Sequence, residues 1–147
     1  MKVYVLSGSS NVGKTNALHH LAILMDGMQV KYRRDTTISA VPPSTIPFNA
    51  DRQYLFEDLA TGRKIGISTA GDNRRAIDDA FDFFATNNCD VGFVASKSYG
   101  CSIDEIEIRS HAIHVIPVYF WFTWVVNGIR SQSQVQIDTA QILEAVI

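Results

Sequence analysis

The segment KVYVLSGSSNVGKT, residues 2–15, carries the strongest structural signal in this 147-residue chain. Val3 to Leu6 are apolar and include two β-branched residues, which is typical of a buried strand. A loop rich in glycine and serine follows, and apolar residues then recur at helical spacing as far as Met25. We therefore predict a strand over residues 2–7, a loop, and a helix over residues 14–26 that Gly27 ends.

The loop, GSSNVGKT at residues 8–15, has the spacing G-x-x-x-x-G-K-[ST]. This spacing is typical of a loop whose backbone N–H groups converge on phosphate oxygens. Gly8 and Gly13 allow close approach of the backbone to phosphates, Lys14 supplies a positive charge, and Thr15 supplies a hydroxyl for magnesium at the helix start. The residues expected to bind phosphate are Gly8, Ser9, Ser10, Asn11, Val12, Gly13, Lys14 and Thr15. A chance glycine-rich turn is the alternative, but a strand before the loop and a helix after it favour phosphate binding.

Length and composition indicate one globular domain, residues 1–147. The net charge of −2 does not indicate a broad nucleic-acid surface, although local basic clusters stay open. Cys89 and Cys101 are too few for a disulfide framework and match no metal motif, so we expect free thiols and a cytoplasmic protein. There is no signal-peptide pattern, and the longest apolar run, residues 115–126, is too short to span a membrane. We interpret that run as a buried strand.

The rest of the chain alternates predicted strands and helices. After residue 27 we predict a short strand at 30–34, a long loop to about 49, and an antiparallel pair of strands at 52–58 and 64–69 that turns at Gly62. A helix at 73–86, a strand at 91–95 and a helix at 102–112 follow, and the second helix opens with a capping box from Ser102 to Glu105. The chain ends with a strand at 114–122, a turn at Asn127-Gly128 and a final helix that opens at Asp138, with Ile142, Leu143 and Val146 inward. This order indicates an α/β fold with a mainly parallel sheet covered by helices, and a hairpin near 52–69. In such sheets ligands bind at the carboxyl ends of the strands.

The strand, the loop and the helix together resemble the P-loop NTPase superfamily, in which GSSNVGKT corresponds to the Walker A motif. The resemblance implies a three-layer P-loop NTPase fold that binds ATP or GTP with Mg²⁺. The segment from Ile65 to Gly71 resembles the D-T-A-G segment that ends a strand in small GTP-binding proteins, where the glycine N–H contacts the terminal phosphate. The segment from Asp35 to Ile38 is similar to their threonine-bearing switch loop. These resemblances imply that Gly71 binds phosphate and that Thr37 binds magnesium.

The sequence also departs from the pattern of GTP-binding proteins. Ser68 stands where those proteins have a magnesium-supporting aspartate, so the water-mediated contact to magnesium would be weaker or would come from Asp72 instead. No N-K-x-D guanine-recognition motif occurs in the sequence. Ser96-Lys97-Ser98 is no substitute, because it lacks the carboxylate that would accept hydrogen bonds from the N–H groups of guanine. ATP is therefore expected over GTP. Asp72 has a second interpretation as the N-cap of the following helix, and the two roles are compatible.

Basic residues near the phosphates would neutralise transition-state charge or hold a second substrate. The candidates, all expected at the carboxyl ends of strands, are Arg33, Arg34, Arg74, Arg75 and Lys97. We select Arg74 and Lys97 as catalytic candidates because their preceding strands lead toward the loop, with a solvated surface charge as the alternative. Other chemistry-bearing groups are interpreted as structural: Asp78, Asp79 and Asp82 as a solvated helix face, the four histidines as packing or surface residues, and the aromatic residues of 119–124 as core or interface.

Three functions remain open. The first is a nucleoside triphosphatase that uses Lys14, Asp72, Arg74 and Lys97. The second is a kinase for a nucleotide or small molecule, with Asp35 as the base and Arg33 or Arg34 holding the acceptor. The third is a nucleotide-dependent binding module with little turnover. The short chain leaves little room for a lid and an acceptor domain, which favours the hydrolase; the acceptor, the partners and self-association are not determined by the sequence.

Overall fold

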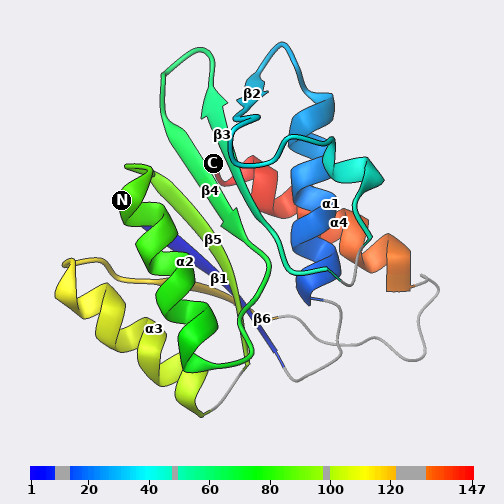
Figure 1. Ribbon diagram of the computed structural model, residues 1–147. Coiled ribbons are helices and arrows are strands. Elements are labelled where there is room, and N and C mark those ends of the chain that lie inside the picture. The colour runs from blue at the N-terminus through cyan, green and yellow to red at the C-terminus, as the bar shows by residue number, and fades with distance from the viewer. Residues whose placement is uncertain (9–13, 48–49, 98–99, 122–131) are drawn as a thin grey trace.

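The computed structural model describes residues 1–8, 14–47, 50–97, 100–121 and 132–147. They form an α/β fold in which a mixed, mostly parallel sheet is flanked by helices (Figure 1). In chain order the elements are β1 (Lys2–Gly8), α1 (Lys14–Gly27), β2 (Tyr32–Arg34), a 3₁₀ turn (Pro43–Thr45), β3 (Gln53–Asp58), β4 (Lys64–Ser68), α2 (Arg74–Thr86), β5 (Val91–Lys97), α3 (Cys101–Ala112), β6 (Val118–Trp121) and α4 (Gln132–Ala145). The described part of the chain has no helix long and apolar enough to cross a membrane.

The strands are ordered β2-β3-β4-β5-β1-β6 across the sheet. β4, β5, β1 and β6 run parallel, whereas β3 runs antiparallel to both of its neighbours. The hairpin expected near residues 52–69 is confirmed as β3 and β4. Its turn contains Gly62 at a φ of +73°, a conformation that glycine adopts without steric cost.

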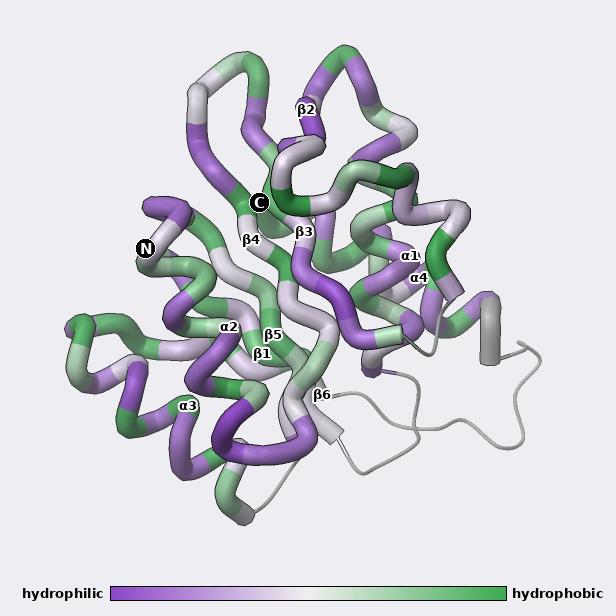
Figure 2. Tube along the Cα trace, in the orientation of Figure 1, coloured by the Kyte–Doolittle hydropathy of each residue, from purple (hydrophilic) through white to green (hydrophobic). Residues whose placement is uncertain are grey.

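The sheet separates two hydrophobic cores. Side chains of β1 alternate between them: Tyr4 and Leu6 pack with α1 and α4, and Val3 and Val5 pack with α2 and α3. From β1 the chain crosses through α1 to β2 at one edge of the sheet. From β4 it runs in the opposite direction, through α2 to β5 and through α3 to β6. Because the two directions are opposite, the crossover helices lie on opposite faces of the sheet. Figure 1 shows α1 and α4 on one side and α2 and α3 on the other. In Figure 2, hydrophilic and hydrophobic residues alternate along α2 and α3, as expected for helices with one buried face.

The carboxyl ends of β1 and β5 lie together at one edge of the sheet. The pairing register places Gly8 of β1 opposite Lys97 of β5. Ser68, the last residue of β4, is opposite Val94 of β5, so β4 ends a little short of the edge where Gly8 and Lys97 lie. Residues that follow these strands share this edge with the start of α1.

Two helix starts differ from the prediction. α3 begins at Cys101 with Gly100 as N-cap, so the capping box from Ser102 is wrong. The Ser102 hydroxyl instead accepts the Lys97 N–H at 3.2 Å, which ties the helix to the end of β5. α4 extends back to Gln132 instead of opening at Asp138.

The end of the chain is also less buried than predicted. Leu143 is buried as expected, but Ile142 and Val146 are 56% and 36% exposed. β6 is a short edge strand and not a buried strand over 114–122, because it begins after Pro117 and pairs only with β1 in the described part of the chain. Tyr119 and Phe120 pack partly against the cores, as expected of this aromatic segment. The predicted turn at Asn127-Gly128 lies outside the described residues.

Candidate functional site

Lys14 opens α1 and turns its ammonium toward the end of β1. Its Nζ donates a hydrogen bond to the Gly8 carbonyl oxygen at 2.7 Å, and the residue is only 6% exposed. Burial lowers the pKa of Lys14; the Asp72 carboxylate acts against this shift, and the positive charge of Lys97 adds to it. Lys14, Asp72 and Lys97 are therefore electrostatic neighbours, although they come from three separate segments of the chain.

Thr15 has a hydroxyl oriented by one contact. Its Oγ1 donates to the Thr69 carbonyl oxygen at 3.0 Å. A hydroxyl has one proton and two acceptor lone pairs, so this bond leaves the oxygen lone pairs available to a metal ion. Magnesium bound with phosphates needs few protein ligands beyond one or two oxygen groups. The Thr15 hydroxyl and the Asp72 carboxylate fit that requirement.

Thr69, the first residue after β4, joins α1 to the start of β3. Its N–H donates to the Arg52 carbonyl oxygen at 3.0 Å, and its hydroxyl accepts the Arg52 N–H at 2.8 Å. Its own carbonyl accepts the Thr15 hydroxyl. Thr69 is not among the predicted site residues, although its place between Ser68 and Gly71 at the end of a predicted strand could have suggested a role.

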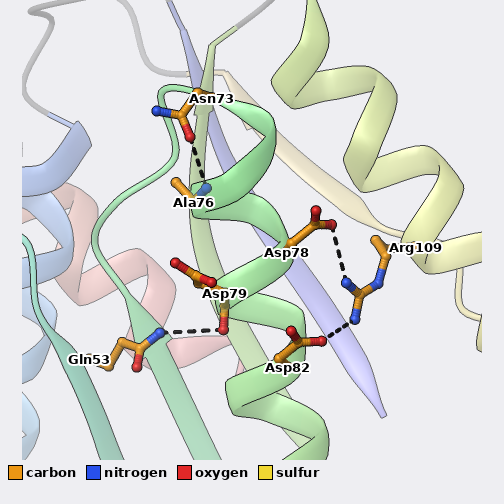
Figure 3. Close-up of polar contacts among 7 residues, drawn as sticks. All are labelled: Gln53, Asn73, Ala76, Asp78, Asp79, Asp82 and Arg109. Carbon is orange, nitrogen blue, oxygen red and sulfur yellow. Dashed lines mark hydrogen bonds and ion pairs between the residues drawn. The ribbon is translucent and has the colours of Figure 1, made fainter.

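Asp72 is not the cap of α2. The N-cap is Asn73, whose side-chain oxygen accepts the Ala76 N–H at 2.9 Å (Figure 3). The capping interpretation of Asp72 is therefore wrong, and its carboxylate is left exposed at the edge where Lys14 lies. Its negative charge instead acts on Lys14, where it opposes the effect of burial on the pKa.

Gly71 lies directly against the end of β5. A Cβ added there would be 1.6 Å from the Ala95 carbonyl oxygen, so no side chain fits. This backbone contact brings the segment 69–72 onto β5, the strand next to β1. A glycine at position 71 is thus required by packing alone.

The two cationic candidates differ in their neighbours. Lys97 ends β5 opposite Gly8, as expected of a residue near the loop. Arg74 begins α2 and lies toward α3, because its charge acts on Asp78. A hydrogen bond with Glu105 holds the pKa of Asp78 below its ordinary value, and the charge of Arg74 lowers it further. Among the described residues, the charges that act on Lys14 are those of Asp72 and Lys97, and Arg74 is not one of them.

The acidic residues of α2 divide between two sides of the helix. Asp78 and Asp82 face α3, where Arg109 binds them at 3.1 and 2.7 Å (Figure 3). Asp79 lies toward β3, and its backbone carbonyl accepts the Gln53 side-chain amide at 3.4 Å. The solvated face that we predicted is therefore partly an interhelical ion-pair network.

β2 does not end near the loop, so the expectation that Arg33 and Arg34 lie at the carboxyl edge is wrong. Across the sheet, Arg34 is opposite Phe56, which is opposite Ile65. Ile65 is opposite Val91, and Val91 is opposite Lys2, so Arg34 lies level with Lys2. Lys2 begins β1, about 20 Å from Gly8 at roughly 3.3 Å per residue. Arg34 binds Asp26 near the far end of α1 at 2.8 Å, and Arg33 binds Glu57 at 2.6 Å.

Asp35 and Thr37 follow β2 and bind each other. Asp35 Oδ1 accepts the N–H and the hydroxyl of Thr37 at 2.9 and 2.6 Å, and these bonds lower the pKa of Asp35. The Asp35 N–H donates to the Leu55 carbonyl oxygen, well away from the carboxyl edge of the sheet. The structure therefore does not bring Asp35 or Thr37 together with Lys14.

Part of the predicted site lies outside the described residues. These positions are Ser9, Ser10, Asn11, Val12 and Gly13 of the loop. Comparisons of the chain with protein-family models, curated proteins and solved structures find no match. We therefore infer a function from the geometry around Lys14.

Proposed function

We propose that this chain is a P-loop nucleoside triphosphatase that binds ATP with Mg²⁺ and hydrolyses its terminal phosphate. The observation that carries the proposal is the buried Lys14, whose ammonium is held at the end of β1 by the Gly8 carbonyl. A strand, the G-x-x-x-x-G-K-[ST] loop and a helix in this order are the context in which that motif binds phosphate.

Each described residue has a chemical role in the proposal. Lys14 neutralises charge on the outer phosphates, and the positive end of the α1 dipole acts in the same direction. Thr15 and Asp72 are the oxygen groups that would hold Mg²⁺, which when bound neutralises further phosphate charge. Asp72 is also available to orient the attacking water, because Asn73 satisfies the helix cap in its place. Lys97 supplies a second cation at this edge.

The arrangement favours hydrolysis over the kinase that uses Asp35 as its base. Arg34 binds Asp26, which is twelve residues after Lys14 in α1 and therefore about 18 Å further along the helix axis. Asp35 follows Arg34 and lies on the same side, so it cannot take a proton from an acceptor held at Lys14. ATP is proposed over GTP because the sequence has no N-K-x-D motif.

Nucleotide binding is tested by titrating ATP, with and without Mg²⁺, into the wild type and Lys14→Ala in a calorimeter. We expect Lys14→Ala to lose affinity by about a hundredfold or more, since a charged contact to phosphate is removed. Lys64→Ala, which removes an exposed lysine at the start of β4, is the matched control and should bind as the wild type does. Equal affinity of wild type and Lys14→Ala contradicts the proposal.

The metal site is tested with Thr15→Val and Thr15→Ser. Valine matches threonine in shape but lacks the hydroxyl, so we expect Thr15→Val to lose the Mg²⁺-dependent part of ATP affinity while Thr15→Ser keeps it. If Mg²⁺ strengthens ATP binding equally in both variants, Thr15 is not a metal ligand.

Turnover is tested by phosphate release from ATP without any added acceptor. Asp72→Asn should slow release by about tenfold or more with little change in stability. Its neighbour provides the control: Asn73→Ala removes the helix cap and should lower stability without slowing release. Nucleotide binding with no phosphate release would identify a binding module instead of a hydrolase.

A further inference from the structure

A groove of about 1090 Å³ separates α2 from the loop that follows β2, and we call it the α2 groove. β3 and the end of β4 lie between these two walls, as can be followed in Figure 1. The lining residues used below are Arg52, Ala70, Asn73, Arg75, Asp79 and Asp82.

One end of the α2 groove adjoins the candidate nucleotide site. Ala70 and Asn73, which line the groove, flank Gly71 and Asp72 in the chain. Arg52 also lines it, and the backbone of Arg52 is bonded to Thr69, whose carbonyl contacts Thr15. A molecule in the groove would therefore sit beside the edge where we place the phosphates.

Two arginines from different segments of the chain line the groove. Arg52 precedes β3 and Arg75 lies in the first turn of α2, and both are exposed. Within the described residues neither guanidinium has a hydrogen-bond or ion-pair partner, whereas Arg33, Arg34 and Arg109 each bind a carboxylate. Guanidinium groups bind carboxylates and phosphates in a bidentate manner, so two such groups on one groove are suited to an oxyanion.

The carboxylates of the groove limit the size of that anion. Asp79 lies one helical turn after Arg75 on the β3 side of α2, and Asp82 also lines the groove while binding Arg109. A strand of nucleic acid along the groove would bring successive phosphates against these carboxylates, which repel them. A small molecule with one anionic group could bind the arginines at a single point and avoid most of these carboxylates, of which Asp51, next to Arg52 in the chain, is a third in the groove.

We infer that the α2 groove is a second ligand site, which binds a small molecule through one carboxylate or phosphate group held by Arg52 and Arg75. The inference concerns a site separate from that of the nucleotide and depends on the groove alone. It also gives Arg75 a role, and it gives Arg52 one that the sequence did not suggest.

The test is a titration followed by the side-chain Nε–Hε NMR signals of arginine in ¹⁵N-labelled protein. Inorganic phosphate and acetate are added separately at constant ionic strength, with chloride as the reference anion. We expect the Arg52 and Arg75 signals to shift together and to saturate with phosphate, with acetate or with both. The anion that saturates them identifies the group recognised.

Four variants give the result its specificity. Arg52→Gln and Arg75→Gln should each weaken groove binding by about fivefold or more, since each removes a charge-assisted contact. Arg33→Gln, an exposed arginine at the far edge of the sheet, should leave it unchanged. Lys14→Ala should also leave it unchanged while abolishing ATP binding, so the two proposals fail independently.

Two results would overturn the inference. One is the absence of saturation in the Arg52 and Arg75 signals with either anion, or an equal response to chloride. The other is an equal effect of Arg33→Gln and Arg52→Gln, which would mean that anions only collect around surface charge. Because these arginine side chains are exposed, the variants should fold, and an unchanged melting temperature verifies it.

Discussion

Replacement of Gly71 by alanine tests the contact that brings the end of β4 to the candidate site. The new Cβ would lie 1.6 Å from the Ala95 carbonyl oxygen and 2.3 Å from its carbon, where side chains need at least 3.0 Å. The two segments must therefore move apart by about 1.4 Å. β5 is held between β4 and β1 in the centre of the sheet, so the displacement falls on residues 69–72.

The expected cost follows from what that displacement breaks. Overpacking against a fixed neighbour costs roughly 1–3 kcal/mol. Moving Thr69 also weakens its hydrogen bonds to Thr15 and Arg52, each worth about 1 kcal/mol. We therefore expect Gly71→Ala to lower the free energy of unfolding by about 3–5 kcal/mol. For a chain of this size that corresponds to a drop of about 10 °C or more in Tm.

Urea unfolding followed by circular dichroism measures the effect, and Gly27→Ala is the matched control. No atom lies within 4 Å of a Cβ at residue 27, and the residue ends α1. The same chemical change should there raise stability by about 0.5–1 kcal/mol, because alanine loses less backbone entropy on folding. A Gly71→Ala variant within 1 kcal/mol of the wild type would refute the packing argument.

Two further predictions concern the α2 cap and a buried histidine. Asn73→Ala should lower the free energy of unfolding by about 1 kcal/mol, while Asn73→Asp keeps the capping oxygen and should not; equal urea midpoints for the two variants would contradict the cap. His19 is buried, with Nε2 2.7 Å from the Ala50 carbonyl oxygen and Nδ1 3.0 Å from the Tyr54 hydroxyl, and burial lowers its pKa below 6.5. The folded state thus favours the neutral ring, so this contribution to stability is complete above about pH 6.5 and declines as the pH falls toward the lower pKa of the folded state. The urea midpoint of the wild type should fall more between pH 7 and 5 than that of His19→Gln, and parallel curves would show that His19 is not responsible.

Local sequence signals predicted the elements around the site well. The apolar run before Gly8 and the helical spacing after Lys14 correspond to β1 and α1, and the hairpin at β3 and β4 was predicted from its turn at Gly62. These features depend on residues close in sequence, whose periodicity and turn chemistry are visible in a single chain. The same holds for α2, whose predicted and observed bounds differ by one residue.

The errors arise where distant segments compete for the same groups. Ser102 has capping-box spacing, but its hydroxyl is used by the Lys97 N–H, and the helix begins earlier. Asp72 and Asn73 are both suitable caps, and the extended backbone of Asn73 selects one of them. The register of β2 against β3, which moves Arg34 away from the loop, depends on pairing that no local pattern specifies.

Two residues differ in how strongly their surroundings support nucleotide binding. Gly71 resembles a phosphate-contacting glycine, yet its contact with Ala95 explains the glycine without any ligand, so it adds little support. Lys14 differs from Gly71, because its burial carries an electrostatic cost that the Asp72 charge only partly offsets. A methionine would fill a similar volume without the cost of removing an ammonium group from water. This cost is the reason that burial lowers the pKa of Lys14. The ammonium has three N–H donors, and in the described part of the chain its hydrogen bond is to the Gly8 carbonyl. We take this charge, kept at that cost, as the main support for the proposal that phosphate binds at the end of β1.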